Sequence, residues 1–421
     1  MDKLPLEIHQ NGQWTLAGHL SMRGQESDGI GAATKFEYDL DYSMTHLHQR
    51  ASLAISLRHP VNVAPYYEES WPPFLLDLFP EGAALKYIER YYKIRALEKN
   101  YWAILNQAVI TPPGNIRVPP SEDEQNRCQV RHKGFTRQEV LDKGPDFLEY
   151  MVLNGASIGG STAAGGGAPK FLLREDFDGW FHADLALSDQ ETKQCWLVKF
   201  PRGSATDDRL ILQNEAAYYR VAGHLGIQTP LPPTWEQDTL FYPRFDRERQ
   251  GQELVYYGME SLYSASGITI FGAEGWFEEY LATIARFSDS PQDDGYEYLA
   301  REIINVLMGN TDNHGRNTAF IKDSSKVRLA PLYDFCPMQF DPGLIRRTTR
   351  WKEPAWDFNY IEKQMTRLFP KGDFKPRIND LFQRCLKLED AMKEEGVSAL
   401  YIDKTSKQRS AFMKNMSQWL G

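Results

Sequence analysis

A polar run at residues 310–317, with the sequence NTDNHGRN, carries the residue types and spacing that suit phosphoryl transfer. This reaction needs a carboxylate to orient the attacking hydroxyl and Mg²⁺ to bridge and neutralise the phosphates. Asp312 can take the first task, while Asn317, five residues later, and Asp334, 17 residues later again, can hold the metal. Each residue alone also fits a polar loop with capped turns, but the three in this order favour a phosphotransferase site.

A Gly-rich stretch at residues 159–170, GGSTAAGGGAPK, offers a second phosphate-binding element. Backbone N–H groups of Gly165, Gly166 and Gly167 can converge on phosphate oxygens because no Cβ atom obstructs them. Lys170 follows where it can add a positive charge. The stretch does not match the P-loop pattern GxxxxGK[ST], and a flexible linker is the alternative interpretation. Its position directly before an expected strand favours the phosphate loop.

Lys199 stands inside the short apolar run WLVKF, which is typical of a β-strand. A lysine is costly to bury unless its charge is paired, and kinases place such a lysine on the ATP phosphates. Glu215, 16 residues later in an expected helix, is the candidate partner. A surface lysine and a solvated glutamate are the alternative.

The segment FYPRFDR at residues 241–247 is expected to be extended and to connect the two halves of the chain. Its central residues, Arg244 and Phe245, can present backbone groups to the edge of an adenine base. By itself this segment is weak evidence for a nucleotide site.

The N-terminal part of the chain has the pattern of a mostly β, mixed region. Asn11-Gly12 suits a tight hairpin turn because both positions tolerate positive φ. The pattern also predicts strands at 51–57 and 115–118 and a helix at 74–92.

The remainder divides into a mixed part and a helical part. The mixed part is predicted to hold helices at 137–151 and 207–225 and strands at 171–174, 180–187 and 196–200. The helical part is predicted to hold helices at 275–287, 296–308, 358–368, 374–394 and 405–419, with short strands at 318–321 and 327–329. A strand-rich half followed by a helix-rich half, with polar candidates at the junction, predicts two lobes that enclose a cleft.

Composition excludes several classes of protein. The 421 residues are 42% hydrophobic with a formal net charge of −9, which disfavours direct binding to nucleic acid. The four cysteines are far apart and match neither a zinc site nor a disulfide framework, as suits a reducing cytoplasm. We expect no signal peptide, no membrane-spanning helix and a cytoplasmic location.

Taken together, these motifs resemble the HipA-like toxin kinases, bacterial Ser/Thr kinases distantly related to protein kinases. The matches follow the family order: AAGGGAPK, VKFP, NE at 214–215, RFDR, NTDxHxxN and PLYD at 331–334. The N-terminal part is similar to the family's N-terminal subdomain through FEYD, ISL, LLDLFPE and GNIRV, at residues 36–39, 55–57, 75–81 and 114–118. The resemblance covers about residues 5 to 400.

The resemblance implies roles for individual residues. Asp312 would be the catalytic base, His314 would support its loop, and Asn317 and Asp334 would bind Mg²⁺. Lys199 would contact the ATP phosphates, as the Gly-rich loop and Lys170 would, and Arg244-Phe245 would face the adenine.

The resemblance also implies the architecture: an α/β (α+β), two-lobed protein-kinase-like fold with an all-α C-terminal lobe. On this basis we expect a β-rich N-terminal subdomain at 1–120, an N-lobe at 121–255 and a C-lobe at 256–421.

Partners and regulation follow from the resemblance alone. The family's partners are a small helix-turn-helix antitoxin, often bound to operator DNA, and protein substrates that include aminoacyl-tRNA synthetases. Family members commonly carry an autophosphorylated serine in the phosphate loop, but Ala163 and Gly165 occupy the usual positions here. Ser157, Ser161 and Thr162 are the nearby candidates.

The sequence therefore leaves three functions open: a Ser/Thr protein kinase, a nucleotide-binding corepressor without phosphotransfer, and a small-molecule kinase. The intact set of Lys199, Asp312, Asn317 and Asp334 favours the first function over the second. The large N-terminal subdomain disfavours the third.

Overall fold

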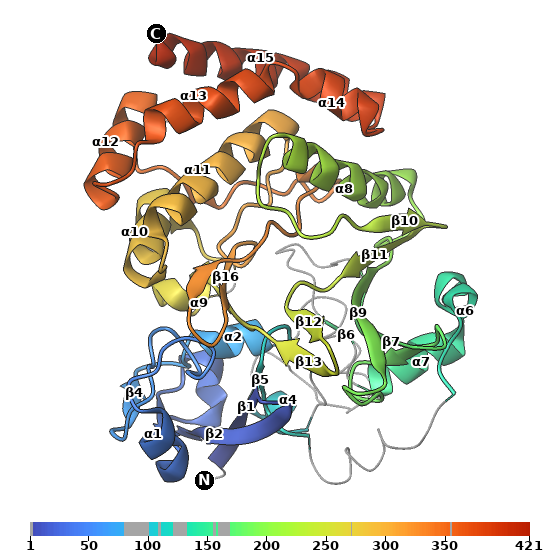
Figure 1. Cartoon of the computed structure of the whole chain (residues 1–421), viewed down its shortest axis with the longest axis vertical. Helices are drawn as coiled ribbons and strands as arrows, with labels where there is room; N and C mark the ends of the chain where they lie inside the picture. Colours follow the sequence, from blue (N-terminus) through green and yellow to red (C-terminus); the bar gives the residue numbers. More distant parts are fainter. Residues whose placement is uncertain are drawn as a thin grey trace.

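The computed structural model describes residues 3–79, 101–107, 111–120, 133–154, 157–158, 169–270, 272–353 and 356–421. Several predicted site residues lie outside these ranges, namely Ser161, Thr162, Gly165, Gly166 and Gly167. The described residues form a β-rich N-terminal subdomain, a lobe built on a mixed sheet and a lobe dominated by helices (Figure 1).

The N-terminal subdomain is a five-stranded sheet in the order β4-β3-β2-β1-β5. Its strands are β1 (Lys3–Gln10), β2 (Gln13–Met22), β3 (Thr34–Tyr38), β4 (Tyr66–Glu68) and β5 (Ile116–Arg117). The predicted hairpin is confirmed, since Asn11 and Gly12 connect β1 and β2 with φ of 50° and 74°. The predicted closing strand is confirmed as β5, which pairs antiparallel with β1.

Two predictions for this subdomain need correction. The strand expected at 51–57 is a series of turns. The Ile55 N–H donates to the Tyr38 hydroxyl and the Leu57 N–H to Glu260, so side chains satisfy backbone groups that a strand partner would otherwise bond. The helix expected at 74–92 is observed as α2 (Phe74–Leu78), and residues 80–92 lie outside the described ranges. The other helices are α1 (Leu40–His46) and α4 (Tyr101–Gln107).

The N-lobe is a six-stranded sheet in the order β10-β11-β9-β7-β6, with β8 paired to β7. Its strands are β6 (Ser157–Ile158), β7 (Lys170–Asp176), β8 (Phe181–Ala183), β9 (Thr192–Lys199), β10 (Thr234–Glu236) and β11 (Thr239–Pro243). On its outer side lie α6 (Arg137–Asp142) and α7 (Pro145–Leu153), where one continuous helix was predicted (Figure 1). The break follows from Lys143 at a φ of 55° and from Pro145, which begins the second helix.

Helix α8 (Thr206–His224) connects the two lobes and confirms the predicted amphipathic helix. Asp207 and Asp208 occupy its first turn, where carboxylates suit the helix dipole. Its buried face, which includes Tyr218 and Tyr219, belongs to the same hydrophobic core as the helices of the C-lobe. The helix therefore joins the sheet that carries Lys199 to the C-lobe.

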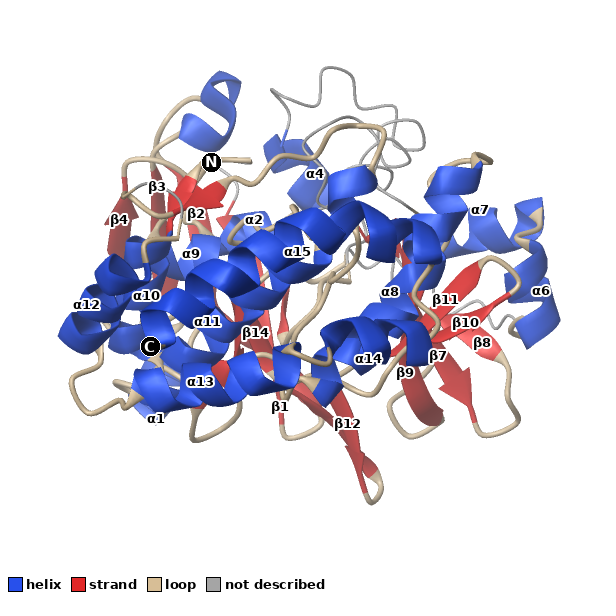
Figure 2. Cartoon of the chain, turned by 90° about the horizontal axis from the view of Figure 1, so that it is seen from above, coloured by secondary structure: helices blue, strands red, loops and turns tan. Residues whose placement is uncertain are grey.

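The C-lobe contains seven of the α-helices in the described part of the chain. These are α9 (Leu262–Ser266), α10 (Phe277–Phe287), α11 (Pro291–Met308), α12 (Phe358–Leu368), α13 (Phe374–Cys385), α14 (Leu388–Glu394) and α15 (Ala399–Leu420). Figure 2 shows α11, α13 and α15 side by side over the sheets. The helix predicted at 374–394 is two helices, because the chain turns between α13 and α14.

The expectation of an all-α C-lobe is wrong. A three-stranded antiparallel sheet in the order β14-β16-β17 lies within it, formed by β14 (Gly258–Ser261), β16 (Ala319–Lys322) and β17 (Val327–Leu329). Its apolar residues pair across the strands, Phe320 with Leu329, and are buried in the lobe. Two small ribbons complete the described strands: β12 (Arg247–Gln250) with β13 (Glu253–Tyr256), and β15 (Gly275–Trp276) with β18 (Thr349–Arg350).

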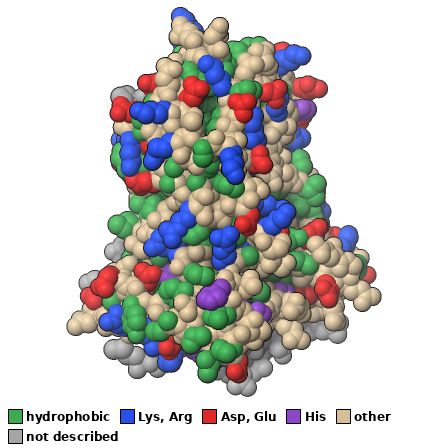
Figure 3. All heavy atoms as spheres, turned by 60° about the vertical axis from the view of Figure 1, so that its left-hand side comes forward, with side chains coloured by type: hydrophobic (Ala, Val, Ile, Leu, Met, Phe, Trp, Pro, Cys, Tyr) green, Lys and Arg blue, Asp and Glu red, His purple; other side chains and the backbone are tan. Residues whose placement is uncertain are grey.

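The surface is of mixed charge. Acidic and basic side chains are interspersed on the face drawn in Figure 3. Among the described residues, no helix is both long and apolar enough to cross a membrane. Three of the four cysteines, Cys195, Cys336 and Cys385, are buried and free, and Cys128 lies outside the described ranges.

Candidate active site

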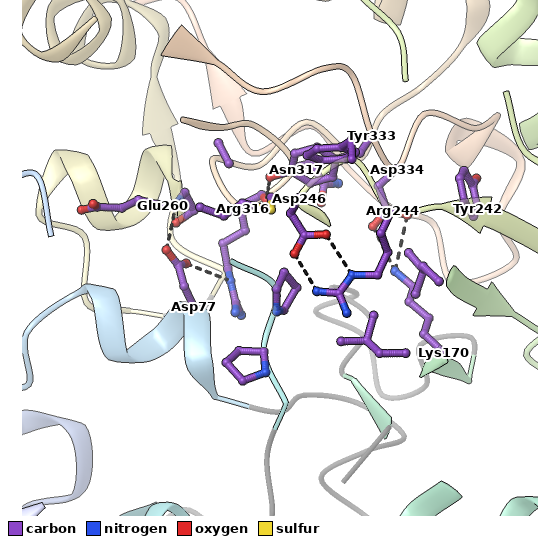
Figure 4. A pocket seen from close by; sticks show the side chains of 18 of the residues that line it. Asp77, Lys170, Tyr242, Arg244, Asp246, Glu260, Arg316, Asn317, Tyr333 and Asp334 are labelled. Carbon is purple, nitrogen blue, oxygen red and sulfur yellow. Dashed lines mark hydrogen bonds and ion pairs between the residues drawn. The ribbon is translucent and has the colours of Figure 1, made fainter. Parts of the chain in front are cut away.

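A cleft lies where the N-lobe sheet, the segment after β11, the C-lobe and the N-terminal subdomain meet (Figure 4). The cavity has a volume of about 230 Å³. Six predicted site residues line it together: Lys170, Lys199, Arg244, Phe245, Asn317 and Asp334. The sheet contributes the two lysines, the segment after β11 contributes Arg244 and Phe245, and the C-lobe contributes the other two residues.

The two lysines form a buried charge cluster with Glu215 and Asp334, which we call the lysine cluster. Lys170 begins β7 and Lys199 ends β9, and the antiparallel register places them directly opposite each other. Lys199 Nζ lies 2.6 Å from Glu215 Oε1 and 2.5 Å from Asp334 Oδ1, while Lys170 Nζ lies 3.0 Å from Asp334 Oδ2. The ion pair predicted between Lys199 and Glu215 is therefore present.

The lysine cluster shifts the pKa values of Lys199 and Asp334. Burial works to lower the pKa of the Lys199 ammonium, but Asp334 and Glu215 outweigh burial and hold that pKa well above its usual value. Burial likewise opposes ionisation of Asp334, but Lys170 and Lys199 outweigh it and hold the pKa of this carboxyl far below its usual range. Lys199 and Asp334 are thus both charged near neutral pH, which gives the cleft fixed charges of both signs.

The polar run begins where α11 ends. Gly309, at a φ of 74°, ends the helix in the left-handed conformation, and residues 310–317 follow as an irregular loop. Gly315 lets this loop approach the core closely, since a Cβ atom there would lie 2.4 Å from the Tyr263 ring. We call residues 310–317 the catalytic loop, after the role that the sequence predicts for them.

Hydrogen bonds within the catalytic loop fix Asp312. Its N–H donates to Asn310 Oδ1 at 3.1 Å, and its carbonyl oxygen accepts from Asn317 Nδ2 at 2.9 Å. His314 Nε2 lies 3.2 Å from Asp312 Oδ1. Burial raises the pKa of the Asp312 carboxyl above its ordinary value; His314 opposes this rise and the nearby Asp334 charge adds to it. The loop thus brings together the predicted carboxylate, the predicted supporting histidine and Asn317.

Both residues of the predicted adenine-facing pair, Arg244 and Phe245, line the cleft. The ring centroid of Phe245 lies 6.0 Å from that of Tyr333. The Arg244 guanidinium pairs with Asp246 at 2.6 Å and with Asp184 at 3.3 Å. It belongs to a buried group that we call the arginine cluster, made of Arg174, Asp184, Arg244, Asp246 and Arg247. Arg244 and Asp246 are the members of this cluster that also line the cleft.

Other residues around the site were not found from the sequence. Asn313 accepts bonds from the N–H groups of Thr348 and Thr349 and so ties the catalytic loop to the segment after Asp334. Asp77, from α2, lines the cleft opposite the sheet. A single Asp within the apolar run LLDLF was the available signal for Asp77.

Ser157, a predicted candidate for self-phosphorylation, lies in β6, opposite Phe171 of β7.

The lobes and the cleft between them indicate the class of protein. A mixed-sheet lobe and a mainly helical lobe, joined beside a cleft with paired lysines and a polar loop, form a two-lobed protein-kinase-like fold. A model of the HipA-like C-terminal domain matches residues 162–390, and one of the HipA N-terminal domain matches residues 6–118. The first match spans more than half of the chain, so the chain belongs to the HipA family.

Individual relatives agree with this family. The chain is 26% identical over 324 residues to the protein named "Putative kinase Y4mE" of Sinorhizobium fredii NGR234, covering 72% of this chain and 73% of the relative. It is 22% identical over 314 residues to "Putative kinase Y4dM" of the same organism, covering 68% of each.

A solved structure shows the same fold. HipA of Shewanella oneidensis MR-1, in a complex with HipB and operator DNA, matches with a TM-score of 0.65 at 17% identity. The match covers 98% of this chain and 97% of that chain. The similarity therefore extends over the N-terminal subdomain as well as both lobes.

Proposed function

We propose that the chain is an ATP- and Mg²⁺-dependent Ser/Thr protein kinase. The observation that carries this proposal is the convergence, at one cleft, of the lysine cluster with a catalytic loop that holds Asp312 and Asn317. Catalysis of phosphoryl transfer depends mainly on positioning and on fixed charges, and this cleft supplies both.

The residues present fit an ATP molecule. Lys170 and Lys199 supply positive charge where the phosphates would bind, and Leu172, Leu197 and Phe245 provide apolar walls for the base. Backbone N–H groups of Gly165, Gly166 and Gly167 are proposed to complete the phosphate site. Arg244 then acts by holding the connecting segment through its ion pairs, rather than by contacting the base with its side chain.

The residues also fit a magnesium ion. Within the described part of the chain, no group of three or more His, Cys, Asp or Glu side chains could hold a metal. Mg²⁺ needs no such group, because it is usually held by one or two protein oxygens together with phosphates and water. Asp334 and the amide oxygen of Asn317 would hold it, and when bound it would supply charge neutralisation at the phosphates.

Asp312 is the proposed base. As the acceptor hydroxyl oxygen bonds to the γ-phosphorus, the bond from phosphorus to the β–γ bridging oxygen breaks and ADP leaves. The hydroxyl proton passes to the Asp312 carboxylate, whose raised pKa makes it a better proton acceptor than an exposed aspartate. His314 and Asn317 hold this residue in place.

Partners are proposed from the family and from the solved relative. HipA of Shewanella oneidensis was solved with HipB and operator DNA. We propose that this chain binds a small helix-turn-helix antitoxin in the cytoplasm and meets DNA only through it. The proposed substrate is a translation factor such as an aminoacyl-tRNA synthetase, and Ser157, Ser161 and Thr162 are the proposed self-phosphorylation sites.

One observation supports a second candidate, a nucleotide-binding corepressor without phosphotransfer. Both lysines already neutralise Asp334, so a metal ion would have to displace at least one of them. Phosphates entering the cleft would attract these lysines away from Asp334, which favours the kinase.

The two candidates differ in a transfer assay. Purified chain is incubated with Mg²⁺ and γ-labelled ATP, alone and with a cell lysate, beside Asp312→Asn. The kinase proposal predicts label on protein Ser or Thr with wild type and a loss of about 10²-fold or more with the variant, the usual contribution of a general base. Nucleotide binding by the wild type without any labelled protein would support the corepressor instead.

A further inference from the structure

Arg316 lies inside the catalytic loop, yet its side chain extends toward the N-terminal subdomain (Figure 4). Its Nη2 donates a hydrogen bond to the Leu76 carbonyl oxygen at 2.5 Å, and its Nε lies 3.9 Å from Asp77 Oδ1. Both partners belong to α2. A residue between His314 and Asn317 is thus held by a helix about 240 positions earlier in the chain.

The backbone of Arg316 is held from the opposite direction. The Tyr333 hydroxyl donates to the Arg316 carbonyl oxygen at 2.6 Å. Tyr333 immediately precedes Asp334, and Arg316 immediately precedes Asn317. One residue therefore links α2 to both segments that carry the proposed metal ligands.

Helix α2 is itself fixed to the C-lobe. Asp77 Oδ2 accepts a hydrogen bond from the Ser261 N–H at 2.8 Å. The preceding residue, Glu260, accepts from Ser56 Oγ at 2.7 Å and pairs with Lys322 Nζ at 3.2 Å. Lys322 ends β16, the strand that leaves the catalytic loop, and is fully buried. The subdomain thus contacts the loop at Arg316 and the following strand at Lys322.

We propose that Arg316 is a positioning residue through which the N-terminal subdomain holds Asn317 and Asp334 in register for the metal. The metal part of this inference rests on the proposed function. The planar guanidinium contacts a carbonyl oxygen and a carboxylate of the same helix, and these two contacts fix the orientation of the Arg316 side chain. A lysine ammonium would not fix this orientation. Residues that orient metal ligands commonly change metal affinity about 10- to 100-fold when replaced.

The test uses the full-length chain and four variants: Arg316→Gln, Arg316→Lys, Asp77→Asn and the double variant Asp77→Asn/Arg316→Gln. Arg50→Gln is the matched control, because Arg50 also joins the N-terminal subdomain to the C-lobe through Asp289, at 3.2 Å, outside the catalytic loop. Calorimetry measures binding of AMPPNP, a non-hydrolysable ATP analogue, with and without Mn²⁺. Hydrogen exchange measures protection of the amides at residues 312–317.

Arg316→Gln is expected to reduce the Mn²⁺-dependent gain in AMPPNP affinity about tenfold and to speed amide exchange in the loop. Metal-free affinity should stay within about twofold, and Arg50→Gln should change neither quantity. Arg316→Lys should retain only part of the Mn²⁺-dependent gain in AMPPNP affinity. The double variant should lose no more than Arg316→Gln alone, because Asp77 acts through Arg316.

Unchanged loop exchange in Arg316→Gln, or equal losses in Arg50→Gln, would overturn the inference. If the wild type binds no AMPPNP, the proposed function fails, but the exchange measurement still decides whether Arg316 holds the loop. Faster exchange in Arg316→Gln but not in Arg50→Gln would then support the coupling without the metal.

Discussion

Two clusters of buried charge start on the same strand and serve different purposes. Lys170 of the lysine cluster and Arg174 of the arginine cluster are four residues apart on β7. Lys170 and Lys199 line the cleft and share Asp334 between them. Arg174 pairs with Asp184 at 3.1 Å, with side chains that are each 5% exposed. Arg244 and Asp246 of the arginine cluster also reach the cleft, whereas Arg174, Asp184 and Arg247 are buried away from its lining.

One cluster uses arginines and the other lysines, and the chemistry of each side chain suits its place in the protein. An arginine remains charged and forms several hydrogen bonds in fixed directions, which suits a permanent joint between the N-lobe and its connecting segment. A lysine is a compact charge on a flexible stem and can exchange one anion for another. We therefore propose that the lysine cluster receives an anionic ligand and that the arginine cluster mainly maintains the fold.

The largest expected effect is on stability, in Arg174→Met. Removal of one partner leaves buried charge unpaired, which typically costs about 3 to 5 kcal/mol. Arg174 also donates to Asp189, at 2.6 Å, and to Tyr256. Urea unfolding should show this loss, while the folded variant should keep wild-type affinity for AMPPNP. A stable variant with weakened nucleotide binding would reverse the roles given to the two clusters.

Lys170→Met tests the other cluster. Asp334 keeps Lys199 as a partner, so the free energy of unfolding should fall by less than about 3 kcal/mol, the lower end of the loss when a buried charge is left unpaired. Affinity for AMPPNP should fall about tenfold, as expected for one lost charge-assisted hydrogen bond. Calorimetry and urea unfolding measure the two quantities on the same sample. A large loss of stability with unchanged affinity would mark Lys170 as structural.

Asp77 extends the comparison, because its proton affinity is shifted in the opposite direction from that of Asp334. Burial raises the pKa of Asp77 to about 6 from an ordinary value of 3.8, and Arg316 opposes the rise. Between these two pH values the folded chain retains a proton that the unfolded chain loses, so this group's contribution to stability falls as pH rises.

Asp77→Asn should remove this dependence. Relative to the variant, wild type should lose on the order of 2 kcal/mol of unfolding free energy between about pH 4 and pH 6. The measurement is the urea midpoint of both proteins across this range. Parallel pH profiles would show that the Asp77 carboxyl is not shifted.

Local patterns predicted much of the fold and part of the site. Asn11-Gly12 gave the hairpin because positive φ is a property of those residue types, and Gly309 ends α11 for the same reason. The pair Lys199 and Glu215 was predictable because a buried lysine needs a carboxylate and the next helix supplied one.

Contacts between distant segments were not predictable. Arg316 and Leu76 are far apart in sequence, and no periodicity relates them. The false strand at 51–57 has the same cause: its composition suits a strand, but Tyr38 and Glu260 bond its backbone from elsewhere in the chain. The ion pairs of Arg244 with Asp184 and Asp246 could not be foreseen either, because no local pattern relates these side chains.

Asp312 and Asp334 have different proposed roles in the cleft, one toward the acceptor hydroxyl and the other toward the metal. Calorimetric titration of AMPPNP into wild type, Asp312→Asn and Asp334→Asn, with and without Mg²⁺, tests this difference most directly. Asp312→Asn should keep the Mg²⁺-dependent gain in affinity, because its carboxylate serves the hydroxyl. Asp334→Asn should lose about tenfold or more of that gain. Equal Mg²⁺-dependent affinity in all three proteins would contradict the assignment.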